Sequence, residues 1–145
     1  MLRKRLGDTG FFQGMKDYLA DANFAYDYAK TEDYKAKMEV ASGENLTEFF
    51  NEWVYKQGYP SYTVEWSLAS ANLIQFELNQ TQSHASVSFF EAPVTVRIHG
   101  TGGKMQEELL DHTFGGETFD KSVAFNVASV EFGPETDLIS KNNYF

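Results

Sequence analysis

Apolar residues in the first part of the chain recur with the period of a helix, and the first predicted helix covers roughly residues 8–20. Asp8 is placed to cap its N-terminus. Residues 1–6 are expected to be the tail of an earlier helix whose beginning is missing, and residues 20–28 a loop or short turn. The apolar face of the predicted helix consists of Phe11, Phe12, Met15, Tyr18 and Leu19.

Two further helices are predicted before residue 58. Thr31 is expected to cap the first of them, and Ser42-Gly43 ends it in the manner of a helix C-terminus. Asn45 is expected to open the second, with Glu48 at the reciprocal capping position. Gly58-Tyr59-Pro60 then stops the helical pattern. The predicted apolar faces consist of Tyr34, Met38 and Ala41 in one helix, and of Leu46, Phe49, Phe50, Trp53 and Val54 in the other.

Beyond Pro60 the apolar pattern changes to alternation, which is typical of half-buried antiparallel strands. About seven short strands separated by turns predict a β-sandwich, with turns at residues 100–103 and at Gly115-Gly116. The predicted fold class is therefore α+β: a short N-terminal helical segment of three to four helices over residues 1–58, followed by an antiparallel Ig-like β-sandwich over residues 59–145. The residues that carry the strand prediction are Tyr62, Val64, Trp66, Leu73 to Leu78, Val94, Val96, Ile98, residues 107–113, Thr118, Phe119, Val123, Phe125, Val127, Val130 and Phe132.

Charge and composition exclude several classes of function. The net charge is −9, and most of it lies beyond residue 57, so binding to nucleic acid is not expected. The chain has no cysteine, which excludes disulfides, thiolate nucleophiles and Cys-ligated zinc. No apolar run is long enough to span a membrane. The compartment stays open, because cysteine-free chains occur both in the cytosol and among exported proteins.

Few residues form a pattern that indicates chemistry. None of the three histidines, His84, His99 and His112, has another histidine at metal-ligand spacing, and a triad around Asp111-His112 has no nucleophile motif to support it. Adjacent carboxylates at Glu32-Asp33 and Glu107-Glu108 do not face each other in a helix or a strand, so they are not expected to act as an acid–base pair. The glycines at 100–103 lack the lysine of a phosphate-binding loop.

The aromatic residues around the change of pattern, Trp53, Tyr59, Tyr62 and Trp66, allow two interpretations. Exposed rings would stack on sugars, and the chain would then be a stand-alone β-sandwich module with a helical cap that binds carbohydrate or protein. Buried rings would form a packed joint between the helices and the sheet. The second interpretation is favoured because Trp53 lies in the same stripe as Phe49 and Phe50.

A set of short motifs runs through both halves of the sequence: Leu6-Gly7-Asp8, Phe11-Phe12-Gln13-Gly14, Tyr18-Leu19, Thr31-Glu32-Asp33, Ala41-Ser42-Gly43, Leu46, Phe49-Phe50, Trp53, Gly58-Tyr59-Pro60, Val64-Glu65-Trp66, Gln80-Thr81-Gln82 and Phe89 to Val94. With the motifs up to Pro60, the helical half resembles the last helices of the catalytic domain in the aminopeptidase N family of zinc metallopeptidases, the gluzincins. With the remaining motifs, the β half is similar to the domain that follows the catalytic domain in that family.

This resemblance implies a zinc-dependent parent enzyme that removes N-terminal residues from peptides. In the family, H-E-x-x-H and a further Glu hold zinc, the motif Glu is the general base, a Tyr stabilises the oxyanion, and G-x-M-E-N binds the substrate's amino terminus. None of these motifs occurs in this sequence. No catalytic or metal-binding residue is therefore assigned, and the substrate-binding residues are unknown.

The resemblance also implies partners and a location. The remainder of the parent catalytic domain is the expected partner, zinc is expected in the full-length parent, and the chain alone is expected to be inactive and prone to self-association. A cell-envelope or secreted location fits a bacterial parent, and a cytoplasmic location stays open.

Overall fold

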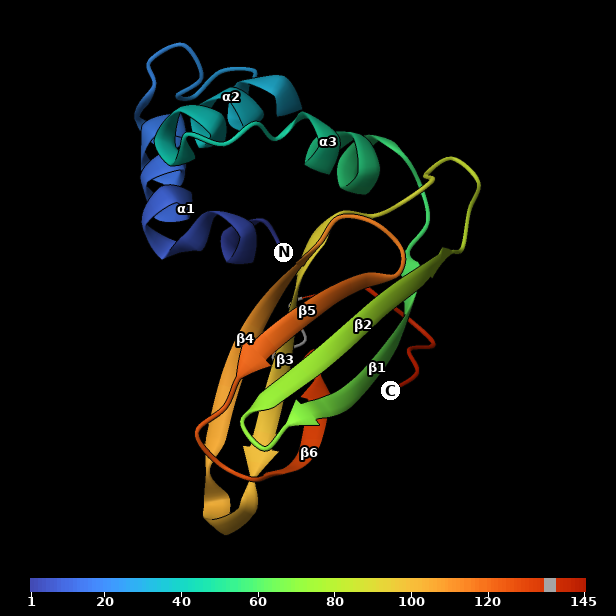
Figure 1. Ribbon diagram of the computed structural model, residues 1–145. Coiled ribbons are helices and arrows are strands. Elements are labelled where there is room, and N and C mark those ends of the chain that lie inside the picture. Colours follow the sequence, from blue (N-terminus) through green and yellow to red (C-terminus); the bar gives the residue numbers. More distant parts are fainter. Residues whose placement is uncertain (135–137) are drawn as a thin grey trace. The chain divides into compact units, whose positions relative to one another are not determined.

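The computed structural model describes residues 1–134 and 138–145, and the chain forms two compact units, Met1–Tyr55 and Lys56–Phe145 (Figure 1). The first unit is helical and the second is a β-sandwich, so the predicted α+β class is confirmed. No helix in the described part of the chain has the length and apolar character needed to cross a membrane.

The helical unit begins with α1 (Leu2–Ala20), which combines the helical tail expected at residues 1–6 with the helix predicted from Asp8. Gly7 interrupts it with a φ of 67°, so the residues before and after Gly7 form two helical segments. Asp8 was expected to cap the second segment. Its carboxylate instead accepts hydrogen bonds from Arg3 Nε at 2.7 Å and from Arg3 Nη2 at 2.9 Å. This two-pronged pairing uses both oxygens of the side chain.

Helix α2 (Thr31–Ser42) packs against α1 through glycines. A Cβ atom on Gly14 would lie 3.2 Å from the Met38 Cα atom and 2.5 Å from its sulfur, and a Cβ on Gly10 would lie 3.3 Å from the Ser42 Cβ. The two helices can approach this closely only because these positions have no side chain. The loop predicted before α2 is confirmed, with turns at residues 22–26.

The ends of α2 differ slightly from the prediction. The N-cap residue is Lys30, whose N–H donates to Asp33 Oδ2 at 2.8 Å, and Thr31 is the first helical residue rather than the cap. At the other end the prediction is confirmed, because Gly43 has a φ of 76° and its N–H donates to the Glu39 carbonyl oxygen at 2.8 Å. A left-handed glycine is the usual way to end a helix.

The third predicted helix is divided into α3 (Thr47–Phe50) and a π-helical turn (Asn51–Tyr55). Asn45 Oδ1 accepts the Thr47 N–H at 2.9 Å, but the N-cap residue is Leu46, so the predicted reciprocal capping by Asn45 and Glu48 is wrong. The wider π turn changes which side chains face inward. Glu52 is buried, whereas Val54 is 47% exposed, so the prediction that Val54 belongs to the buried stripe is wrong.

The sandwich unit has six described strands rather than about seven. They are β1 (Pro60–Ser70), β2 (Leu73–Gln82), β3 (Ala92–Gly100), β4 (Met105–His112), β5 (Glu117–Ser122) and β6 (Val127–Phe132). All pairs are antiparallel, with strand orders β1-β2-β5 and β4-β3-β6. Val123 and Phe125 were expected to form part of a strand but lie in the connection from β5 to β6.

One apolar core joins the two sheets of the sandwich. Its fully buried members come from the inward positions of both sheets, and Val123 joins them from the connection. The Phe125 ring occupies the space beside Gly100, where a Cβ atom would lie 2.3 Å from Phe125 Cδ2. Strand-like alternation at 123–127 therefore reflects burial in a connection rather than pairing in a sheet. The buried members are Tyr62, Val64, Ile74, Phe76, Leu78, Val94, Val96, Ile98, Leu110 and Val123.

Candidate functional site

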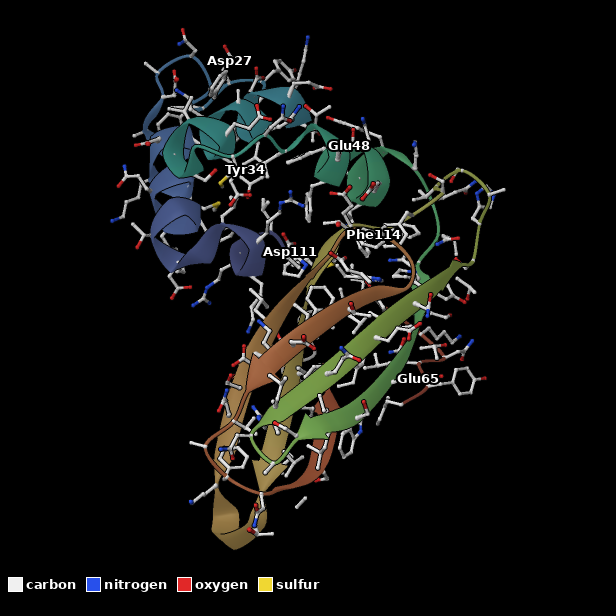
Figure 2. All side chains as sticks on the ribbon, in the orientation of Figure 1. Asp27, Tyr34, Glu48, Glu65, Asp111 and Phe114 are labelled. Carbon is white, nitrogen blue, oxygen red and sulfur yellow. The ribbon has the colours of Figure 1, made fainter. Side chains whose placement is uncertain are left out.

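His112 at the end of β4 is a core residue and not part of a triad. Its ring is 0% exposed, and Nε2–H donates to the Leu78 carbonyl oxygen at 3.1 Å. The centroid of its ring lies 5.0 Å from that of the Phe89 ring and 5.8 Å from that of the Tyr62 ring. Burial lowers the pKa of His112, which favours the neutral ring. Asp111 (Figure 2) is exposed, and neighbouring residues of a strand point to opposite faces, so the two side chains cannot act together.

His99 belongs to an ion-pair network on the outward face of the β4-β3-β6 sheet. Arg97 Nε donates to Glu107 Oε1 at 2.8 Å, and Arg97 Nη1 lies 3.4 Å from Glu131 Oε2. His99 Nε2 lies 3.2 Å from the same Glu131 oxygen. The network spans three neighbouring strands and is open to solvent on one side. The network therefore links the three strands across the sheet. Each partly exposed ion pair of this kind contributes little to stability by itself.

His84 lies in the loop after β2 and helps to hold the Gly-Tyr-Pro segment. Its ring lies 3.0 Å from Gln57 Nε2, and a Cβ atom on Gly58 would lie 3.1 Å from the His84 Cβ. Gly58 has a φ of 115°, which disfavours other residues. Tyr59 N–H donates to Ser83 Oγ at 2.8 Å, and its carbonyl oxygen accepts the Ser83 N–H at 3.0 Å. The motif thus anchors the start of β1 to a distant loop, a role that its position after a helix did not indicate.

The adjacent carboxylates each have a structural partner. Glu107 pairs with Arg97, whereas Glu108 lies on the other face of β4, 3.2 Å from Lys121 Nζ. This confirms that the two point to opposite faces. Glu32 Oε1 accepts the Tyr55 hydroxyl at 3.0 Å, and Asp33 Oδ2 accepts the N–H of Lys30, the N-cap residue of α2. Neither pair is arranged for acid–base catalysis.

The three histidines do not form a metal site. They lie in a loop, on the outward face of β3 and in the sandwich core, and each has the separate partners given above. Across residues 1–134 and 138–145, no three His, Asp or Glu side chains are grouped so that they could hold a metal ion. The donor side chains of the described residues therefore do not fit a zinc centre.

The glycines at 100–103 form the predicted turn. Gly102 and Gly103 have φ values of 75° and 76°, and Gly100 N–H donates to the Lys104 carbonyl oxygen at 2.8 Å. The turn contains one short 3₁₀ turn (Thr101–Gly103) and connects β3 directly to β4, so it is not followed by the α-helix whose N-terminus a phosphate-binding loop requires.

The aromatic residues proposed for sugar stacking do not form an exposed platform. Tyr62 is 0% exposed inside the sandwich core, and Tyr59 is half-buried. Trp66 is 38% exposed on β1. In the helical unit, the Trp53 ring lies 6.5 Å from the Phe49 ring, as the stripe predicted. One partly exposed tryptophan is a weak basis for carbohydrate recognition.

The helical unit carries large apolar side chains that the unit itself does not cover. Leu19 is 66% exposed and Val40 is 81% exposed. Tyr26 is fully exposed and has a φ of 63°, a strained conformation for a bulky residue. Inside the unit, Tyr34 packs edge-on against Tyr18 at 5.4 Å (Figure 2). The fully buried apolar residues described in this unit are Met38, Leu46, Phe49 and Phe50.

Comparison with known proteins finds aminopeptidases. Aminopeptidase M1-A of Oryza sativa subsp. japonica is 35% identical over 100 residues, which are 66% of this chain and 11% of the relative. Probable aminopeptidase 2 of Sulfurisphaera tokodaii is 28% identical over 100 residues, 69% of this chain and 12% of the relative. Aminopeptidase 2, mitochondrial, of Saccharomyces cerevisiae is 36% identical over 87 residues, 60% of this chain and 9% of the relative.

No family model matches the chain. The chain is similar to a segment of much longer aminopeptidases, and the matched part spans 12% or less of the length of the three relatives above.

Proposed function

We propose that this chain is the end of the catalytic domain of a zinc aminopeptidase, together with the β-sandwich domain that follows it. The similarity to several aminopeptidases carries the proposal. The parent enzyme would be a gluzincin that hydrolyses the N-terminal peptide bond of peptides. Zinc would be held by residues outside this chain, because the donor set described here does not fit it.

The helical unit would support the zinc site from behind. Its uncovered apolar side chains, Leu19 and Val40 among them, provide surface against which the rest of a catalytic domain would pack. The glycine contact between α1 and α2 would keep this support rigid, since the helices approach too closely to slide without steric conflict. Support of this kind holds catalytic groups in position without contacting the substrate.

The sandwich unit would brace the catalytic domain. It has an apolar core of its own, formed between its two sheets. Gly58-Tyr59-Pro60 fixes the first residues of β1 to the loop at 83–86. The unit can therefore form a firm base for what precedes it in the chain.

The proposal is tested by comparing this chain with the same chain extended upstream by its natural sequence. We expect the upstream sequence to contain H-E-x-x-H and a Tyr-x-Lys-Gly segment, in which the Tyr would be the residue that stabilises the oxyanion. The extended protein should bind one zinc per chain and cleave aminoacyl p-nitroanilides. This chain alone should do neither, and sedimentation velocity should show association that increases with protein concentration.

Several results would contradict the proposal. Stoichiometric zinc binding or aminoacyl-amide cleavage by this chain alone would do so. An upstream sequence without the zinc motif would contradict the proposed activity of the parent enzyme. A clean monomer at high concentration would contradict the expectation that the uncovered apolar side chains cause self-association. Inactivity has to be accompanied by a folded NMR spectrum, so that it is not mistaken for unfolding.

A further inference from the structure

The edge of β1 changes character halfway along the strand. Over its first half, the C-terminal segment pairs with it: Val64 N–H donates to the Tyr144 carbonyl oxygen at 2.9 Å, and Tyr144 N–H donates to the Tyr62 carbonyl oxygen at 2.9 Å. Thr63 and Tyr144 form a parallel bridge. Figure 1 shows β1 at one side of its sheet, with the C-terminal segment beside it.

The second half of this edge has backbone groups available for pairing. The backbone groups of Tyr62 and Val64 point away from β2, and this orientation repeats every second residue of a strand. Those of Trp66 and Leu68 therefore point away from β2 as well. Among the described residues, nothing beyond Val64 forms a backbone hydrogen bond on this side of β1. An open strand edge is a template for an added strand.

The side chains beside this open edge are apolar on one face. Trp66 and Leu68 lie in register with the buried residues Phe76 and Ile74, yet they are 38% and 51% exposed. They continue the inward row of Tyr62 and Val64 past the point where that row is covered. An added strand with apolar residues on this face would shield both side chains from water.

The other face beside the edge is acidic. Glu65 on β1 (Figure 2) lies directly opposite Glu77 on β2, an arrangement in which like charges repel. They line a shallow hollow of about 140 Å³ together with Trp66, Ser67 and Gln75. The outward positions of β1, β2 and β5 include a third carboxylate, Asp120, and no Lys, Arg or His. A cationic side chain in this hollow would relieve the repulsion.

We propose that the edge of β1 from Glu65 to Leu68 is a docking site for an extended basic protein segment in which apolar and Lys or Arg residues alternate. The segment pairs with the backbone of Trp66 and Leu68. Its apolar residues cover the Trp66 and Leu68 side chains, and its basic residues reach Glu65 and Glu77. Backbone pairing provides the affinity and the two rows of side chains provide the selectivity, as in other cases of strand addition.

The test is a titration of the ¹⁵N-labelled chain with a capped peptide of about seven residues in which Val and Lys alternate, a length typical of one strand. We expect the amide signals of Trp66 and Leu68 to shift together, with weaker effects on the β4-β3-β6 sheet. The same peptide with Glu in place of Lys, and a version with methylated backbone nitrogens, should bind at least tenfold more weakly.

Matched charge reversals separate this site from general attraction to an acidic protein. Glu65→Lys should weaken binding of the Val–Lys peptide about three- to tenfold, whereas Asp111→Lys, an exposed carboxylate on the other sheet, should change it less than twofold. Trp66→Ala should weaken binding without unfolding the chain, because the side chain is already partly exposed.

The proposal is overturned if a folded chain shows no shift at Trp66 and Leu68. It is also overturned if the Glu peptide binds as well as the Lys peptide, if Glu65→Lys and Asp111→Lys weaken binding equally, or if the shifts centre on another surface. Binding of an oligosaccharide at Trp66, with no binding of the Val–Lys peptide, would replace the inference with a glycan site.

Discussion

The helical unit and the sandwich unit differ in the size of their buried apolar cores, which contain four and ten buried residues respectively among those that the structure describes. Residues at inward positions of both sheets meet in one sandwich core, where Phe76 and Leu110 are 0% exposed. The helical unit has a small buried cluster, while Leu19 and Val40 remain largely exposed. Because burial of apolar surface is the main source of stability, the sandwich should be stable by itself and the helical unit marginal.

The means of close packing differ as well. In the sandwich, large side chains fill the space between the sheets. Between α1 and α2, the contact depends on two positions that have no side chain, Gly10 and Gly14. A core of large residues loses stability when a side chain is removed, and a glycine contact loses it when a side chain is added. Removing a side chain from the sandwich core and adding one at a glycine of the helical unit therefore test whether the two units differ in this way.

The largest expected effect comes from truncating the sandwich core. Phe76→Ala should lower the free energy of unfolding of the sandwich by about 3–5 kcal/mol, because it removes a fully buried ring and leaves a cavity. Urea unfolding followed by circular dichroism measures the change. Phe114→Ala is the matched control, because that ring is 58% exposed, and it should change stability by less than about 0.5 kcal/mol. Equal losses in the two variants would show that the core described here does not hold the unit together.

Filling the glycine contact should come next. Gly14→Leu places a side chain where a Cβ atom would already lie 3.2 Å from the Met38 Cα, so the helical unit should lose roughly 1–3 kcal/mol and unfold locally. Amide exchange by NMR should show lost protection in α1 and α2 while β2 and β3 stay protected. Gln13→Leu, at an exposed neighbouring position, is the control and should leave protection unchanged. Loss of protection in both units at once would show that they fold as one.

Acid should weaken the sandwich through His112. Burial lowers the pKa of His112 below its usual value of 6.5, so the unfolded chain binds a proton more readily than the folded chain does. The stability contributed by the neutral ring is present above about pH 6.5, falls as the pH drops towards the folded pKa, and is lost once the pH passes below it. The free energy of unfolding should fall less between pH 7.5 and about pH 5 in His112→Gln than in the unsubstituted chain. The Gln amide can still donate to the Leu78 carbonyl oxygen. An identical pH slope in both proteins would rule out His112 as the cause.

The smallest expected effect is in the surface ion-pair network. Arg97→Ala should cost about 0.2–1 kcal/mol, because the pairs with Glu107 and Glu131 are partly solvated. Most of the difference in stability between Arg97→Ala and the unsubstituted chain should disappear in 1 M NaCl, where the charges are screened. A loss of several kcal/mol that is insensitive to salt would mean that Arg97 stabilises the sheet through packing instead.

Several local features follow from sequence patterns because neighbouring residues decide them. Gly43 ends α2 in the left-handed conformation, and Glu107 and Glu108 point to opposite faces of β4, as alternation in a strand requires. The prediction that Tyr62 and Val64 lie on the buried face of a strand is also confirmed. Each of these depends only on the geometry of one turn or one strand.

Other features depend on contacts that a local pattern does not contain. Val54 matches a helical stripe, but the π turn moves it into solvent and brings Glu52 inward. Asp8 is a suitable cap, but Arg3 occupies its carboxylate. Val123 and Phe125 alternate as in a strand, although their partners are Asn72 and Gly100 rather than a neighbouring strand.

By itself the sequence determined the α+β class, the change from a helical to a strand period near Pro60, the main turns and the absence of a zinc motif from these residues. Those properties depend on composition and on local periodicity. Only the tertiary structure decided that His112 is buried against the Leu78 carbonyl, that Gly58 is required by the approach of His84, and that β1 is paired along half of its edge. Each of these depends on residues far apart in the chain, whose spacing carries no periodic signal.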